Sequence, residues 1–151
     1  MKKIAKILRK HNYEVIKLKQ MTTNHLQLKA SINGVKGRFI LDTGASNSCV
    51  NLNLVAHFKL KASESDTKAA GAGAIDMETQ QSENNSISIG KWKSKKLHLI
   101  LFDLHHVNTA LTQHNAKEVH GIIGADILQK GRAFIDYNKN VLYLKQKKNK
   151  R

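Results

Sequence analysis

One segment near the start of the chain constrains the fold more than any other. HLQLKASI at 25–32 alternates apolar with polar residues, Asn33-Gly34 supplies a two-residue hairpin turn, and VKGRFIL at 35–41 returns as a second strand. Two further pairs of strand-like runs lie at 85–90 with 95–104, and at 133–137 with 141–145 across a turn at 138–140. Three hairpins in a short chain predict a β-rich domain.

The segments between these hairpins have other patterns. VNLNLVAHFKL at 50–60 predicts a strand that leads into a short helical turn, and 124–131 predicts a short helix closed by Gly131. The small residues and glycines of 67–80 suit a mobile hairpin, whereas the polar, histidine-rich 105–120 predicts a long surface connection. Proline is absent, so the turns depend on glycine and asparagine.

Length and composition place the chain among single-domain globular proteins. The 151 residues suffice to bury a real core, and the 40% hydrophobic content excludes a fibrous or disordered class. No internal repeat is present. Aromatic residues make up only 5% of the chain, which argues against a platform for stacking nucleic-acid bases.

The net charge of +15 is concentrated near the two ends. Residues 1–20 contribute +6, and 145–151 add five cations and no acid, so these ends hold 11 of the 15 excess charges. This distribution predicts a basic N-terminal extension at 1–20, a folded domain at 21–145 and a basic tail at 146–151. We expect the ends to be solvated and poorly ordered. The alternative is nonspecific contact with nucleic acid or an anionic membrane surface.

Targeting signals are not evident in the sequence. No stretch approaches the ~18 apolar residues of a transmembrane segment, and the basic start lacks the apolar core of a secretory signal. Cys49 is the only cysteine, which excludes an internal disulfide. We therefore expect a cytoplasmic protein.

Residues 39–50, FILDTGASNSCV, place an acid at the end of an apolar strand. A buried carboxylate is costly unless it is paired or hydrogen-bonded, so Asp42 requires an explanation. The simplest one is a turn aspartate that accepts backbone N–H bonds. A second apolar-glycine element, HGIIGADIL at 120–128, favours a functional role instead.

Three stretches together resemble the retropepsin-like aspartic proteases, the single-domain relatives of the retroviral proteases. They are ILDTGAS at 40–46, GIIGADIL at 121–128 and AFIDYNKNVLYL at 133–144, and the similarity extends over about residues 22–145. The resemblance implies an all-β closed barrel with a flap hairpin and one short helix, acting as a homodimer. In this family the D-[TS]-G aspartate ends a strand at the active site, and the later apolar-apolar-Gly element passes close to it in a ψ-shaped loop.

The resemblance also implies roles for individual residues. These are Asp42 as the catalytic residue, Thr43, Gly44 and Ala45 as its support, Ile122, Ile123 and Gly124 as the ψ loop, and Gly71, Ala72 and Gly73 as the substrate-binding flap. In the family the threonine hydroxyl hydrogen-bonds across the dimer axis. Glycine lets the backbone approach the facing subunit, and small residues after it leave room for substrate. For Gly124 we expect close packing of the ψ loop. The flap glycines have the alternative role of ending strands.

Aspartic proteolysis needs two carboxylates that share a proton, because two like charges so close together cannot both ionise. The chain has one D-T-G; Asp126 follows a glycine but lacks the motif, and the chain is too short for two lobes. A two-fold dimer supplies Asp42 twice. The expected activity is cleavage of an extended polypeptide, with no metal or organic cofactor.

Other chemical groups give weaker signals. Cys49 near His57 raises the possibility of a cysteine nucleophile, but no orienting third group is evident, and a small buried thiol is favoured. Four histidines offer metal ligands at spacings that match no zinc template: His105, His106, His114 and His120. A histidine-rich surface loop is favoured. Family members often carry an acid at the position of His120.

Two rival functions remain open on the sequence. One is a catalytically silent retropepsin-like domain that dimerises or binds peptides, which the intact D-T-G argues against. The other is a nucleic-acid-associated module that works through its basic tails, and the small charge of the body argues against a dedicated nucleic-acid face there.

Overall fold

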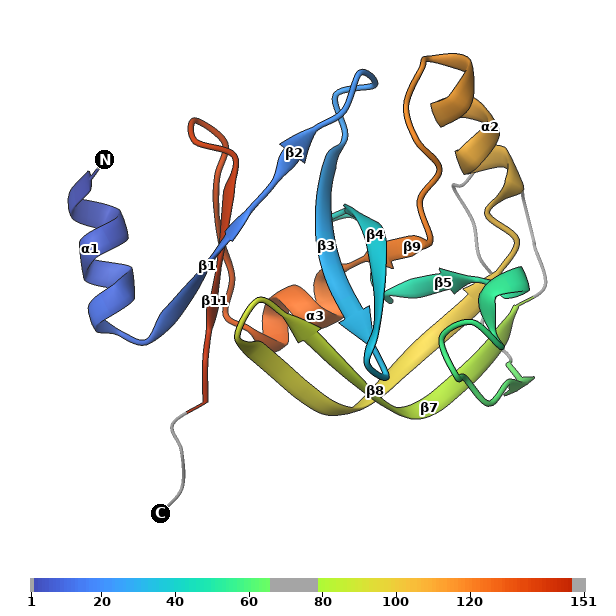
Figure 1. The fold of residues 1–151 in the computed structure, drawn as a ribbon. Coiled ribbons are helices and arrows are strands. Elements are labelled where there is room, and N and C mark those ends of the chain that lie inside the picture. Colours follow the sequence, from blue (N-terminus) through green and yellow to red (C-terminus); the bar gives the residue numbers. More distant parts are fainter. Residues whose placement is uncertain (1, 66–78, 148–151) are drawn as a thin grey trace.

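The structure is a computed structural model that describes residues 2–65 and 79–147 (Figure 1). Its strands dominate and its helices are short. In chain order the elements are α1 (Lys2–Lys10), β1 (Tyr13–Lys17), β2 (Lys19–Gln20), β3 (Leu26–Ile32), β4 (Val35–Leu41), β5 (Cys49–Asn51), a 3-10 turn η1 (Leu52–Leu54), β6 (Ser63–Glu64), β7 (Gln80–Ile89), β8 (Trp92–Phe102), α2 (His105–Gln113), β9 (Gly121–Ile123), α3 (Ala125–Lys130), β10 (Phe134–Asp136) and β11 (Val141–Lys145).

Six strands close into a barrel in the order β3-β4-β9-β5-β8-β7, and β7 pairs back with β3. The pairings β4–β9 and β5–β8 are parallel, and the other neighbours in the ring are antiparallel. A second sheet, β1-β11-β10, lies beside the barrel (Figure 1). The predicted all-β closed barrel is confirmed.

The β3–β4 hairpin forms as the alternating pattern predicts. Asn33 and Gly34 adopt φ values of 51° and 82°, the left-handed values that a tight two-residue turn requires. Leu28 and Ile32 point into the main core, whereas Lys29 between them is exposed. This core also contains side chains from the 3-10 turn region, the β7–β8 hairpin and β11, so it joins the barrel to the second sheet.

The predicted basic extension at 1–20 is wrong for its second half. β1 pairs with β11 over five residues, from Tyr13 opposite Lys145 to Lys17 opposite Val141, and Ile16 and Leu18 are buried in the main core. The folded domain therefore begins before residue 21. The apolar side chains of this segment alternate with lysines, and burial of one face outweighs the high local charge.

The first ten residues also have structure, because α1 covers Lys2–Lys10 and packs near β1. Leu8 is buried, but Ile4 and Ile7 on the same helix are 48% and 55% exposed. In Figure 1 this helix lies at the edge of the second sheet, away from the barrel.

The predicted long surface connection at 105–120 is also wrong, because α2 occupies its first half. Leu111 is buried against a small apolar cluster, and the buried Asn108 side chain exchanges two hydrogen bonds with the backbone of Val119. These contacts stabilise a helix whose polar sequence has little amphipathic signal. With α1 and α2, the described residues hold three α-helices where the resemblance implied one.

The predictions for 50–60, for 124–131 and for the other two hairpins hold, whereas the hairpin predicted at 67–80 lies, except for its last two residues, outside the described residues. A strand and a 3-10 turn follow one another at 49–54, and α3 ends at Gly131, whose N–H donates to Ile127. The β7–β8 and β10–β11 hairpins are present. Within the described residues, no helix is long and apolar enough to cross a membrane.

Candidate active site

The D-T-G turn follows directly from β4. The N–H of Asp42 donates to the carbonyl of Ile123 at 2.9 Å, which continues the parallel pairing of β4 with β9 by one residue. Beyond it the chain turns, with the Gly44 N–H donating to Asp42 Oδ1 at 2.9 Å and the Ala45 N–H to the Asp42 carbonyl at 3.2 Å. The turn therefore holds the carboxylate in one orientation.

The Asp42 side chain is not buried, contrary to what the sequence suggests. Asp42, Thr43 and Gly44 are exposed in the single chain, and Ala45 is half-buried. Among the described residues, the only hydrogen bond to the carboxylate comes from Gly44. A carboxylate that is anchored at its backbone and open on its other side is available to a ligand or to a second protein surface.

The ψ loop packs against this turn. β9 lies between β4 and β5, with Ile122 opposite Ile40 on one side and opposite Cys49 on the other. At its end, a Cβ atom on Gly124 would lie 2.5 Å from the carbonyl oxygen of Ala45. The Ala125 N–H donates to this same oxygen at 2.7 Å. Only glycine permits so close an approach between the two loops.

A network of side-chain hydrogen bonds also joins the D-T-G turn to the ψ loop. The Ser48 N–H donates to both carboxylate oxygens of Asp126 at 3.0 Å, and the Ser48 hydroxyl donates to Oδ1 at 2.7 Å. The Gly124 N–H in turn donates to the Ser48 hydroxyl oxygen at 2.8 Å. Ser48 is fully buried.

The sequence did not reveal this network. Asp126 lies two residues after Gly124 and Ser48 six residues after Asp42, so the only signal was a hydroxyl and an acid near the two motifs. Because the Asp126 carboxylate is bonded to Ser48, it holds the site together and is not free to act as a second catalytic acid.

His120 directly precedes β9 and is hydrogen-bonded to Arg38 of β4. Its Nδ1 accepts a hydrogen bond from the backbone N–H of Arg38 at 2.8 Å, and the backbone N–H of His120 donates to the Arg38 carbonyl at 2.8 Å. Burial lowers the pKa of His120, and the nearby cation of Arg38 and the imidazole of His57 lower it further. A neutral ring with an unprotonated Nδ1 suits the acceptor role.

The other histidines that offered a metal site are not gathered with His120. His105 and His106 lie in the first turn of α2, with ring centroids 6.0 Å apart, and His114 follows the end of that helix. His120 instead stacks with His57, with ring centroids 6.2 Å apart. Within residues 2–65 and 79–147, no group of three or more His, Cys, Asp or Glu side chains is placed to hold a metal ion.

Cys49 is the small buried thiol that the sequence favours. It lies in β5 among Ile100, Phe102 and Leu104, and burial raises its pKa to about 12. A thiol that stays protonated at neutral pH is not an activated nucleophile.

The flap residues Gly71, Ala72 and Gly73 lie outside the described residues. The strands on either side of that segment are described: β6 pairs antiparallel with the start of β7, with Ser63 opposite Gln81 and Glu64 opposite Gln80.

Known proteins share both the sequence pattern and this fold. Residues 28–127 match the family model described as aspartyl protease. No curated protein matches the chain. Among solved structures, a retropepsin-like aspartic protease from Rickettsia conorii is 21% identical, with a TM-score of 0.54 over 87% of each chain.

Two further structures extend the comparison. EIAV protease, solved with the inhibitor HBY-793, is 21% identical with a TM-score of 0.53 over 73% of this chain and 90% of its own. The retroviral protease-like domain of Ddi1 from Leishmania major is 16% identical with a TM-score of 0.53 over 80% of this chain and 87% of its own. At these identities the structures show the shared fold, while the family model covers about two thirds of the chain. The chain therefore belongs to the aspartyl protease family and has the retropepsin-like fold.

Proposed function

We propose that this protein is an aspartic endopeptidase that cleaves extended polypeptides as a symmetric homodimer, with Asp42 of the two subunits as its catalytic pair. The position of Asp42 carries the proposal. Its backbone is fixed by β9 and by the turn, while its carboxylate faces outward in the single chain.

The dimer follows from the chemistry that one chain lacks. Peptide hydrolysis by this route needs a second carboxyl group beside the first, and the chain has one D-T-G. Asp126, the other acid of the two loops, is bonded to Ser48. A two-fold axis beside the exposed turn brings a second Asp42 to the first.

In such a pair one carboxyl group is ionised and the other is protonated. The ionised group takes a proton from a water molecule, whose oxygen attacks the scissile carbonyl carbon. The protonated group donates a hydrogen bond to the carbonyl oxygen as negative charge develops there. Proton transfer to the amide nitrogen then lets the C–N bond break, which releases a carboxylic acid and an amine.

The remaining predicted site residues have supporting roles in this proposal. Thr43 holds the two turns together across the axis, and Gly44 and Ala45 leave room for the partner and the substrate. Gly71, Ala72 and Gly73 cover the bound peptide. These roles, the cytoplasmic location and the lack of a cofactor are predictions.

The direct test compares the wild-type protein with Asp42→Asn in a peptide-library cleavage assay between pH 4 and 7. Asp136→Asn is the matched control, because Asp136 also ends a strand and its Oδ1 accepts the N–H two residues later, from Asn138 at 2.9 Å. We expect Asp42→Asn to abolish cleavage and Asp136→Asn to retain it.

The same assay decides between the protease and a catalytically silent domain. Absence of cleavage by a wild-type protein that sediments as a dimer would favour the silent domain. Equal cleavage by wild type and Asp42→Asn would remove Asp42 from the mechanism.

A further inference from the structure

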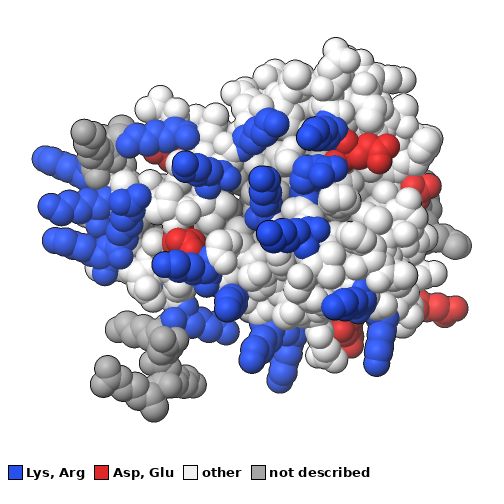
Figure 2. All heavy atoms as spheres, in the orientation of Figure 1, with Lys and Arg blue, Asp and Glu red and all other residues white. Residues whose placement is uncertain are grey.

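A hollow of ≈ 620 Å³ opens on the outer face of β3 and β4, between β2 and the segment that leads into β9. Five cationic residues line it, namely Lys19, Lys29, Lys36, Arg38 and Lys117. Among the described residues that line this cationic groove there is no carboxylate. Figure 2 shows the Lys and Arg side chains that gather over this part of the molecule.

The strand register creates this concentration of charge. Leu28 and Ala30 point into the core, so Lys29 between them points outward, and it lies directly opposite Arg38 on β4. Like charges directly opposite each other on neighbouring strands destabilise a sheet. An anion bound across the pair would relieve this repulsion. The Arg38 guanidinium donates to the backbone carbonyl of Glu118. Because this acceptor is neutral, the contact does not neutralise the positive charge of Arg38.

The uncharged side chains that line the groove are better suited to binding phosphate than to binding a peptide. Gln27, Ser31 and Ser88 offer amide and hydroxyl donors, and Ser31 lies opposite both Ser88 and Lys36. Neutral donors beside lysines are typical of contacts to phosphate oxygens. No large apolar side chain lines the described part of the groove, so it has no pocket for the side chains of a polypeptide. No Phe, Tyr or Trp lines it either, and His120 is its one aromatic ring, which argues against a base-stacking platform there.

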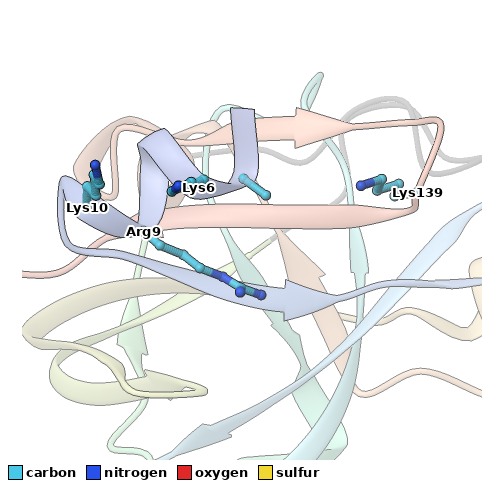
Figure 3. A pocket seen from close by; sticks show the side chains of 5 residues that line it. Lys6, Arg9, Lys10 and Lys139 are labelled. Atoms are coloured by element: carbon cyan, nitrogen blue, oxygen red, sulfur yellow. The ribbon is translucent and has the colours of Figure 1, made fainter. Parts of the chain in front are cut away.

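The positive surface continues beyond the groove. An adjoining hollow shares Lys19 and Lys29 with it and adds Lys17 of β1, and its other lining is largely apolar, from residues 15–18 and Leu28. Farther along, a third hollow lies between α1 and the β10–β11 turn, lined by Lys6, Arg9, Lys10 and Lys139 together with Ala5 (Figure 3). A surface of this extent matches a long polyanion rather than a single small anion.

We propose that the cationic groove binds the phosphate backbone of a nucleic acid without reading its base sequence. This function is separate from the proposed peptidase activity. The proposed binding surface lies on the folded body, although the sequence indicated only a small net charge there. The strand register gathers lysines and an arginine on one face of the body.

The test measures binding of fluorescein-labelled 20-nucleotide single strands of mixed sequence, DNA and RNA, by anisotropy between 50 and 200 mM salt. The groove variant is K19Q/K29Q/K36Q, and the matched control K61Q/K95Q/K130Q removes the same charge from exposed positions outside all three hollows. We expect the groove variant to bind at least about tenfold more weakly and to lose about 2 from the slope of log K against log salt, since each phosphate contact contributes about 0.7. We expect the control to stay within about twofold of wild type. An unchanged far-UV circular dichroism spectrum and a urea midpoint no lower than that of wild type would show that the fold of the groove variant is intact.

Several outcomes would overturn the proposal. Equal loss in the groove and control variants would assign binding to overall charge or to the tails, and no binding at 50 mM salt would exclude a nucleic-acid site. Two competing surfaces are tested alongside. Tighter binding of poly-glutamate than of DNA would assign the groove to an acidic polypeptide. If the groove substitutions weaken co-sedimentation with phosphatidylserine vesicles but leave nucleic-acid binding unchanged, the groove is assigned to a membrane surface.

Discussion

Gly124 and Ala45 are packed backbone against backbone, so that a Cβ atom at position 124 would lie 2.5 Å from the Ala45 carbonyl oxygen. Ala45 belongs to the turn that carries Asp42, and Gly124 ends the ψ loop that pairs with it. The contact therefore fixes the position of the turn relative to the ψ loop. Any side chain at position 124 must move the turn or the loop.

Gly124→Ala is accordingly expected to reduce both stability and cleavage. Overpacking of this kind costs about 1–3 kcal/mol, and the displaced turn would misplace the Asp42 carboxylate. Urea unfolding and peptide cleavage measure the two effects. Gly34→Ala is the control, because Gly34 has a φ of 82° with no atom near its missing Cβ, so it loses stability through backbone strain alone. Full activity in Gly124→Ala would contradict this account of the contact.

The Ser48–Asp126 network is expected to contribute to the free energy of unfolding. Ser48→Ala leaves the Gly124 N–H and one Asp126 oxygen without their hydroxyl partner, which costs about 1–3 kcal/mol in a buried position. Ser86→Ala, at an exposed position on β7, should change the free energy by less than about 0.5 kcal/mol. If Ser48→Ala unfolds at the same urea concentration as wild type, the network does not stabilise the site.

His120 is expected to make the stability of the protein fall in mild acid. Its pKa in the folded state is lowered from an ordinary value of about 6.5, so the unfolded chain takes up the proton first. The stabilisation is complete above the unfolded pKa and is lost as the pH falls through about 6.5 toward the lower folded pKa. Protonation also removes the Nδ1 acceptor of the Arg38 N–H.

Urea midpoints measured from pH 7.5 to 5 test this effect. His120→Asn places a carbonyl oxygen near the position of Nδ1 and cannot titrate, so its midpoint should fall less than that of wild type. His114→Asn, at an exposed position after α2, should follow the wild-type curve. Parallel curves for His120→Asn and wild type would show that another group controls the acid response.

Sequence patterns predicted those parts of the fold that depend on neighbouring residues. The β3–β4 hairpin, with Asn33-Gly34 in its turn, follows from local alternation and from residues suited to their backbone angles, and α3 ends at Gly131 as predicted. The resemblance carried by the D-T-G and Ile-Ile-Gly motifs supplied the closed barrel.

Features that depend on distant partners were not visible in the sequence. β1 pairs with β11 at the other end of the chain, and α2 depends on bonds from Asn108 to Val119. The Ser48–Asp126 bonds join residues 78 positions apart. The cationic groove arises only when the β3–β4 register sets Lys29 against Arg38.

In the proposed enzyme, two chains each contribute one Asp42 to a single site. Subunit mixing tests it most directly: wild type and Asp42→Asn are combined at constant total protein, allowed to exchange subunits fully, and assayed for peptide cleavage. In an equal mixture random pairing leaves about one quarter of the dimers with two intact carboxyl groups, so activity should fall to about one quarter of that of wild type alone. Activity that stays at about one half, in proportion to the wild-type fraction, would mean that each chain acts by itself and would contradict the account.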